Sequence, residues 1–87
     1  MKIKDGFMLR QVCDDYMVIP VGTNSIEFKS VIRLNETGAF LWNVLINGAT
    51  EVELLEALKN EYEIDEAVAK ADILKFLQKL REAEILV

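Results

Sequence analysis

Residues 34–42, LNETGAFLW, mark the point where this chain changes from strand to helix. They follow a strand-like run at residues 30–34, SVIRL. Asn35 is suited to cap a helix, because its side-chain oxygen can accept a hydrogen bond from a free amide of the first turn. Glu36 then lies near the positive end of the helix dipole. Apolar residues continue at helical spacing toward Trp42, so the segment separates a small sheet from a set of helices.

The residues before this segment predict an antiparallel sheet of three strands. Residues 7–12 and 16–20 are rich in apolar and β-favouring residues, and Cys13-Asp14-Asp15 between them reads as a hairpin turn. In the third run, alternate residues share a face, and these are Phe28, Ser30, Ile32 and Leu34. The pattern predicts one face on a core and one partly in water.

The residues after it predict three helices. The first stops at Asn47-Gly48, and Thr50 with Glu53 forms a capping box that starts the second, which ends near Tyr62. The third begins around Asp65, and its apolar spine is Ile73, Leu77 and Leu80. Residues 85–87, ILV, are expected to add a short strand or a packed tail. The order predicts an α+β fold of three antiparallel strands followed by three helices (βββααα), and residues 1–87 are expected to form a single domain.

Composition limits the classes of function. A net charge of −5 disfavours binding to nucleic acid, which needs a basic face. The single cysteine, Cys13, excludes an intrachain disulfide and suits a reducing compartment. No apolar run is long enough to span a membrane, and the N-terminus has no signal-peptide pattern. We therefore expect a cytoplasmic protein that is not bound to a membrane.

The usual groups of an active site are scarce. The chain has no histidine, so the commonest general base and metal ligand are absent, and no metal or cofactor site is expected. Cys13 lies beside two aspartates and lacks the histidine partner of a catalytic cysteine, so it is not expected to act as a nucleophile. Acidic pairs such as Glu61 and Glu63 lie at turns and helix ends, where solvated carboxylates are common. Trp42 is expected to anchor the core rather than to stack on a ligand. The sequence predicts a protein that is not an enzyme.

With these elements in place, the chain resembles the PqqD family, the precursor-peptide recognition elements of ribosomally made, modified peptides. The resemblance rests on the order of elements, on residues 34–42, on the helix start at residues 50–54 (TEVEL), and on the helix at residues 72–80 (DILKFLQKL). It implies a winged-helix-like domain that does not read DNA. It also implies a role like that of the family in coenzyme PQQ biosynthesis. The leader segment of a precursor peptide would add as a strand beside the third strand, and the domain would present it to a modifying enzyme, often a radical S-adenosylmethionine (radical SAM) enzyme.

The expected peptide-binding residues lie on two elements. The edge of the third strand contributes Lys29, Ser30, Val31, Ile32 and Arg33, with Ile32 directed toward the helices. The opposing wall, on the last helix, is expected to comprise Leu74, Leu77 and Arg81. Lys75, Lys79 or Arg81 would pair with acidic residues of the leader. Periodicity alone does not decide which flank of this helix faces the groove.

The chain departs from the family at the end of the last helix. Many members have a glycine turn there, whereas this chain reads Ala83-Glu84-Ile85-Leu86. We therefore expect a longer helix, with terminal residues free to pack elsewhere or to pair with another chain.

Two other functions fit the order of elements. One is a winged-helix transcription regulator that uses the second and third helices as a helix-turn-helix, although its acidity counts against DNA binding. The other is a structural adaptor, including a homodimer formed through the exposed sheet edge.

Overall fold

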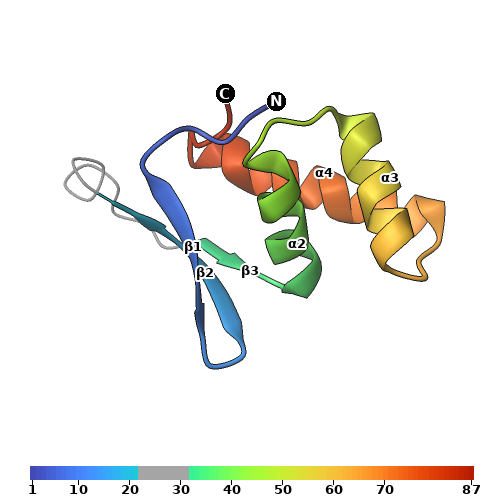
Figure 1. Cartoon of the computed structure of the whole chain (residues 1–87), viewed down its shortest axis with the longest axis horizontal. Helices are drawn as coiled ribbons and strands as arrows, with labels where there is room; N and C mark the ends of the chain where they lie inside the picture. Colours follow the sequence, from blue (N-terminus) through green and yellow to red (C-terminus); the bar gives the residue numbers. More distant parts are fainter. Residues whose placement is uncertain (22–31) are drawn as a thin grey trace.

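The computed structural model describes residues 1–21 and 32–87. Its elements, in order, are β1 (Phe7–Val12), β2 (Asp15–Pro20), β3 (Ile32–Leu34), α2 (Glu36–Leu45), α3 (Glu51–Glu61) and α4 (Glu66–Glu82). The sheet lies on one side of the molecule and the three helices on the other (Figure 1). This arrangement confirms the predicted α+β class and the order of three strands followed by three helices. The predicted site residues Lys29, Ser30 and Val31 lie outside the described residues.

The sheet has the strand order β1-β2-β3, and both pairs are antiparallel. Val12 pairs with Asp15, so the hairpin loop contains only Cys13 and Asp14 and is one residue shorter than predicted. Cys13 has a φ of 56°, the left-handed conformation that two-residue hairpin loops commonly require. In the second pair, Met17 lies opposite Arg33.

Two of the three described helices begin with the predicted side-chain caps. The Asn35 side-chain oxygen accepts from the Gly38 amide at 2.8 Å, which fixes the start of α2 directly after β3. Thr50 and Glu53 form the predicted capping box of α3, with bonds of 3.1 and 3.0 Å. Asp65 is the N-cap of α4, but its side chain accepts no capping bond.

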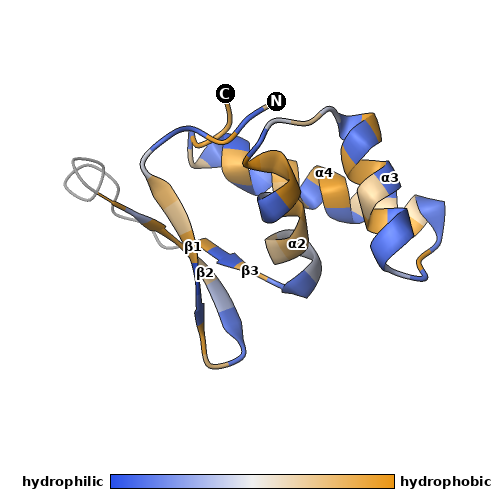
Figure 2. Cartoon of the chain, viewed as in Figure 1, coloured by the Kyte–Doolittle hydropathy of each residue, from blue (hydrophilic) through white to orange (hydrophobic). Residues whose placement is uncertain are grey.

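One hydrophobic core draws residues from the sheet and from all three helices. Trp42 is 1% exposed, which confirms that it is a packing anchor within this core. Apolar and hydrophilic residues alternate along α2 and α4 (Figure 2), and both helices contribute buried residues to this core. The other large, fully buried side chains of this core are Val18, Leu41, Leu45, Leu54, Leu58, Leu77, Leu80 and Ile85.

The C-terminus corrects one sequence prediction. Helix α4 does not run on: it ends at Glu82, and Glu84 takes a φ of 57°. The Glu84 and Ile85 amides donate back to the Arg81 and Leu80 carbonyls at 3.0 and 2.9 Å, the pattern that commonly ends a helix at a left-handed residue. Here a glutamate occupies the position that glycine usually takes.

The terminal residues form the short strand and packed tail that the sequence predicts, and they pair within the chain. The Val87 amide donates to the Lys2 carbonyl at 2.8 Å, and the Lys4 amide donates to the Ile85 carbonyl at 2.7 Å. Ile3 and Leu86 form an antiparallel bridge. The two ends of the chain lie side by side beyond the end of α4 (Figure 1). None of the described helices has the length and apolar character needed to cross a bilayer.

Candidate functional site

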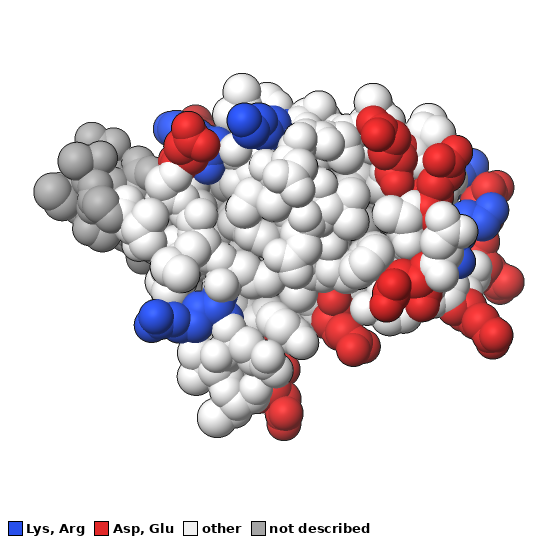
Figure 3. All heavy atoms as spheres, viewed as in Figure 1, with Lys and Arg blue, Asp and Glu red and all other residues white. Residues whose placement is uncertain are grey.

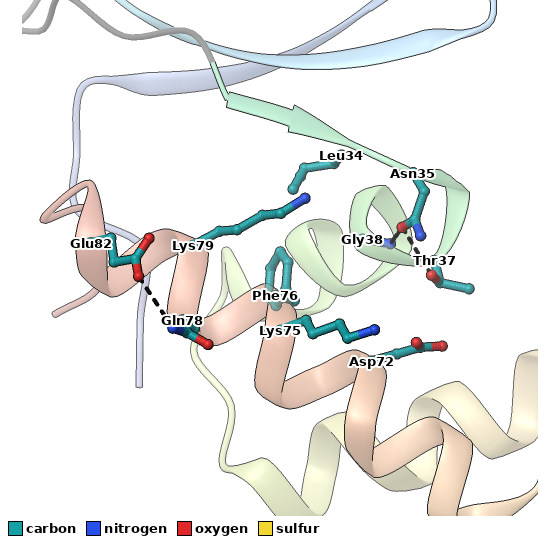
Figure 4. Close-up of a pocket in the computed structure, with 10 residues that line it drawn as sticks. All are labelled: Leu34, Asn35, Thr37, Gly38, Asp72, Lys75, Phe76, Gln78, Lys79 and Glu82. Carbon is teal, nitrogen blue, oxygen red and sulfur yellow. Dashed lines mark hydrogen bonds between the residues drawn. The ribbon is translucent and has the colours of Figure 1, made fainter.

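A pocket of about 250 Å³ opens where the end of β3 and the first turn of α2 face one side of α4. In Figure 4 the side chains from these elements surround a common space. The β3–α2 junction contributes Leu34, Asn35, Thr37 and Gly38, and α4 contributes Asp72, Lys75, Phe76, Gln78, Lys79 and Glu82.

The capping of α2 shapes the near wall of this pocket. Asn35 turns its side chain inward to the Gly38 amide, and the Thr37 hydroxyl donates to the same Asn35 oxygen at 3.0 Å. A Cβ on residue 38 would lie 3.1 Å from that oxygen and 3.2 Å from the Leu34 Cβ, which is closer than ordinary contact. Glycine at this position therefore lets the helix start lie close against β3. The segment that divides sheet from helices is thus also part of the pocket.

The floor of the pocket is apolar and its rim is charged. Leu34 and Phe76 are 6% and 3% exposed, so both belong to the core and present little more than an edge to the pocket. Around them stand two lysines, Lys75 and Lys79, and two acids, Asp72 and Glu82. Among the described residues none of these four charged groups has an oppositely charged group within 4.0 Å. Glu82 accepts from Gln78 at 3.2 Å.

Beside the pocket, β3 is the outer strand of the described sheet. The Val21 amide donates to the Gly6 carbonyl, so these two residues form a hydrogen-bonded pair between β2 and β1. Hydrogen-bonded pairs recur at every second residue of an antiparallel ladder, so Ile19 and Met17 also direct their N–H and C=O groups toward β1. Arg33 lies opposite Met17, and its own N–H and C=O therefore point away from β2, toward the open side. Lys79 lies on that side: its Nζ donates to the Arg33 carbonyl oxygen at 3.3 Å.

The structure brings together only some of the predicted site residues. Arg33 lies at the exposed edge, and Ile32 is half-buried and packs against the core, as predicted. Leu77 is fully buried and packs inside the molecule.

Leu74 and Arg81, the other two residues of the predicted wall, do not line this pocket. Successive helical residues are about 100° apart, so Arg81 lies about 200° around α4 from Lys79, on the flank toward α3. Arg81 there approaches Glu51 at 3.8 Å. Leu74 lines a second, smaller hollow of about 210 Å³ with Glu51, Val52, Leu55, Lys70 and Ile73. The α4 residues that line the pocket are instead Asp72, Lys75, Phe76, Gln78, Lys79 and Glu82. The periodicity of the sequence identifies both candidate faces of this helix. Only the tertiary packing shows which of them lies beside β3.

The described residues contain no group of three histidine, cysteine, aspartate or glutamate side chains placed to hold a metal ion. Two side chains of the described residues have shifted pKa values, and both lie outside the pocket. The Lys59 ammonium, which donates to Glu66 at 3.2 Å, lowers the pKa of that carboxyl, with a further contribution from Lys70. Partial burial, followed by the nearby Glu36 charge, raises the pKa of Tyr62, whose ring packs edge-on against Phe40.

Comparison with known proteins gives the same fold and a family. Over 99% of its length the chain superposes on TbiB1 in complex with the TbiA(beta) leader peptide, with a TM-score of 0.74, 26% identity and 94% of that chain covered. It has the fold of lasso peptide synthetase B1 complexed with the leader peptide, at a TM-score of 0.72 and 20% identity over 99% of this chain and 95% of that one. A search of curated proteins finds no match. Residues 17–86 match the family model described as coenzyme PQQ synthesis protein D. The chain therefore belongs to the PqqD family.

Proposed function

We propose that this protein is a non-catalytic module that captures the leader segment of a ribosomally made precursor peptide by strand addition at β3. The observation that carries the proposal is the outward-facing backbone of Arg33 beside the pocket between β3 and α4. An extended peptide gains affinity from hydrogen bonds to such an edge and selectivity from pockets under its alternate side chains. The similarity to TbiB1, whose structure contains a leader peptide, supports this mode of binding.

The chemistry of the pocket suits a side chain with an apolar body and a polar end. Leu34 and Phe76 offer apolar contact at the floor, and the lysines and acids of the rim remain in water. Ile32 and Arg33 are the described part of the binding edge, and Lys29, Ser30 and Val31 extend it by their positions in the sequence. Leu77 supports the wall from inside the core. Leu74 and Arg81, on the other flank of α4, are free of this groove and available to a second partner.

The module in this proposal makes and breaks no covalent bond, so it presents the peptide to a separate modifying enzyme, a radical SAM enzyme in the form that the family resemblance implies. We place this function in the cytoplasm, in a single domain of residues 1–87, without nucleic acid, cofactor or metal. Self-association through the sheet edge is the competing use of the same backbone groups.

A titration of ¹⁵N-labelled protein with the leader of any small precursor peptide encoded near its gene tests the proposal. We expect amide shifts at residues 32–34 and on the face of α4 that carries Lys75, Phe76 and Lys79. If these amides do not respond while the protein remains folded, peptide capture at β3 is wrong. An apparent molecular mass that rises with protein concentration would favour the homodimer instead, if the amides at the same edge also shift in the absence of peptide.

A pair of substitutions at one position separates backbone from side-chain recognition. Arg33→Pro removes the outward N–H that an added strand would bond, whereas Arg33→Ala keeps it and removes only the side chain. We expect Arg33→Pro to abolish leader binding and Arg33→Ala to retain most of it, measured by calorimetry on variants whose amide spectra show the native fold. Equal loss in both variants would indicate recognition by the Arg33 side chain and not strand addition.

A further inference from the structure

The Lys79 side chain occupies the backbone acceptor that strand addition would use. Its Nζ lies 3.3 Å from the Arg33 carbonyl oxygen, and this carbonyl faces the open side of β3. In an antiparallel pair, the residue of an added strand opposite Arg33 would donate its own N–H to the same oxygen. In the free protein the lysine therefore stands where a peptide N–H would bind.

The surroundings of Lys79 determine which partners its ammonium group has when a peptide strand binds beside β3. No carboxylate of the described chain lies within 4.0 Å of it, and Glu82, one turn further along α4, already accepts from Gln78. Figure 4 shows the Lys79 side chain extended across the pocket toward β3, away from Glu82. An incoming strand that takes over the Arg33 carbonyl removes the hydrogen-bond partner of this ammonium group and leaves its charge at the pocket rim.

We propose that Lys79 exchanges the Arg33 carbonyl for a carboxylate on the bound peptide, and so selects leaders with an aspartate or glutamate at one position. This inference rests on the proposed strand addition. The exchange couples two events: the peptide backbone replaces the ammonium group at the edge, and the peptide carboxylate receives it. A peptide without the acid competes with Lys79 for the carbonyl and gains no ion pair in return.

Strand geometry gives the position of the acid. Side chains alternate between the two faces of a strand, and residues opposite each other in adjacent strands point to the same face. Ile32 and Leu34 pack against the core, so their neighbours in an added strand would point toward α4. The acidic residue is therefore expected immediately before or after the peptide residue that bonds to Arg33. An acid at the Arg33 partner position itself would point away from Lys79.

A selection from a displayed library of random twelve-residue peptides tests the inference without knowledge of the natural precursor. The wild-type protein, Lys79→Met and Lys75→Met are used as separate baits. Methionine keeps an unbranched apolar stem and removes the charge, and Lys75 lines the same pocket without a hydrogen bond to β3. We expect aspartate or glutamate to be enriched at one position by the wild type and by Lys75→Met, and this enrichment to be lost with Lys79→Met.

The best selected peptide and its Asp→Asn or Glu→Gln twin then give the affinities. Lys79→Met should weaken binding of the acidic peptide by about 1.4- to 5-fold, the range of an exposed ion pair. The same substitution should tighten binding of the amide twin by about twofold, because the Lys79 ammonium group no longer competes for the Arg33 carbonyl. Opposite signs for the two peptides distinguish an exchange from a simple loss of contact.

A measurement on the free protein checks the starting contact. The Leu34 amide belongs to the same peptide group as the Arg33 carbonyl, so Lys79→Met should shift this amide and Lys75→Met should not. An acidic preference that survives in Lys79→Met, or disappears only in Lys75→Met, overturns the inference and leaves peptide capture intact. A library in which no peptide is enriched overturns the inference and the proposed function together.

Discussion

Glu84 shows how one residue ends the last helix of this fold. A non-glycine residue at a φ of 57° is strained, because its Cβ approaches the following carbonyl oxygen, at a cost of about 1–2 kcal/mol. The strain is maintained because the turn carries Ile85 into the core, where it is fully buried next to Leu80. We therefore expect Glu84→Gly to stabilise the protein by about 0.5–1 kcal/mol, measured by urea unfolding.

The neighbouring Ala83 provides the matched control. Its φ is −86°, so glycine relieves no strain there and adds freedom to the unfolded chain. Ala83→Gly should lower stability. Equal effects of the two glycine substitutions would mean that the left-handed conformation of Glu84 does not control the stability of this turn.

Glu66 gives a pH dependence that can be assigned to one carboxyl group. Its pKa is lowered chiefly by the hydrogen bond and charge of Lys59, and Lys70 adds less from 3.7 Å. A lowered pKa in the folded state stabilises the fold above the unfolded pKa of Glu66, and this contribution is lost as pH falls through the folded value. Because both side chains are about half exposed, solvent screens the pair and the gain in stability is small.

Carbon-detected NMR titration of the Glu66 carboxyl measures this effect directly. Lys59→Met should raise its pKa toward the ordinary value, and Lys70→Met should raise it by less. A larger change with Lys70→Met would reverse the assigned order of causes.

At the scale of elements, the N-terminal segment and the C-terminal tail stabilise each other across the end of α4. The backbone bonds between residues 2–4 and 85–87 hold the tail in place, and Ile85 fills the core beneath it.

Ile85→Ala should cost about 2–5 kcal/mol of the free energy of unfolding, the usual range for removing a buried aliphatic side chain. Val87→Ala is the control, because Val87 is 74% exposed, and should change stability by less than about 0.5 kcal/mol. Similar losses in both variants would mean that the backbone pairing, and not Ile85 packing, dominates.

Helix α4 serves two surfaces at once. One flank carries Phe76 and Lys79 toward β3, and the opposite flank carries Leu74 and Arg81 toward α3. Between them Leu77 and Leu80 are fully buried. Substitutions of Phe76 or Lys79 should therefore affect binding at β3, whereas substitutions of Leu74 or Arg81 should affect only contacts made by the α3–α4 surface.

At the scale of the whole molecule, charge is unevenly distributed. Aspartate and glutamate side chains gather over the end that carries α3 and its turn into α4, on the face seen in Figure 3. The helix pair that a helix-turn-helix protein would use is thus its acidic part. With a net charge of −5, we expect no retardation of random-sequence duplex DNA in a gel shift even at low salt, because binding to DNA needs a basic face that releases counterions. Retardation that weakens steeply with added salt would revive the transcription-regulator alternative.

Local chemistry explains why much of the fold was predictable. The cap of Asn35, the capping box at Thr50 and the hairpin before Asp15 depend on residues within a few positions of one another, and the structure contains all three. The class of fold follows from the order of such elements. The glycine-free end of α4 was predicted wrongly because the burial of Ile85, a contact made by tertiary packing, outweighs the preference of Glu84 for right-handed backbone.

The sequence by itself therefore determined the strands, the helices, their caps and the absence of histidine chemistry, since these depend on residue type and short-range spacing. Only the tertiary structure decided which flank of α4 faces β3, that Leu74 and Arg81 lie away from the pocket, and that Lys79 reaches the Arg33 carbonyl. Several faces of α4 carry similar sets of apolar and charged residues, so the sequence pattern does not distinguish them. Which face meets the strand is set by packing among residues that are far apart in the chain.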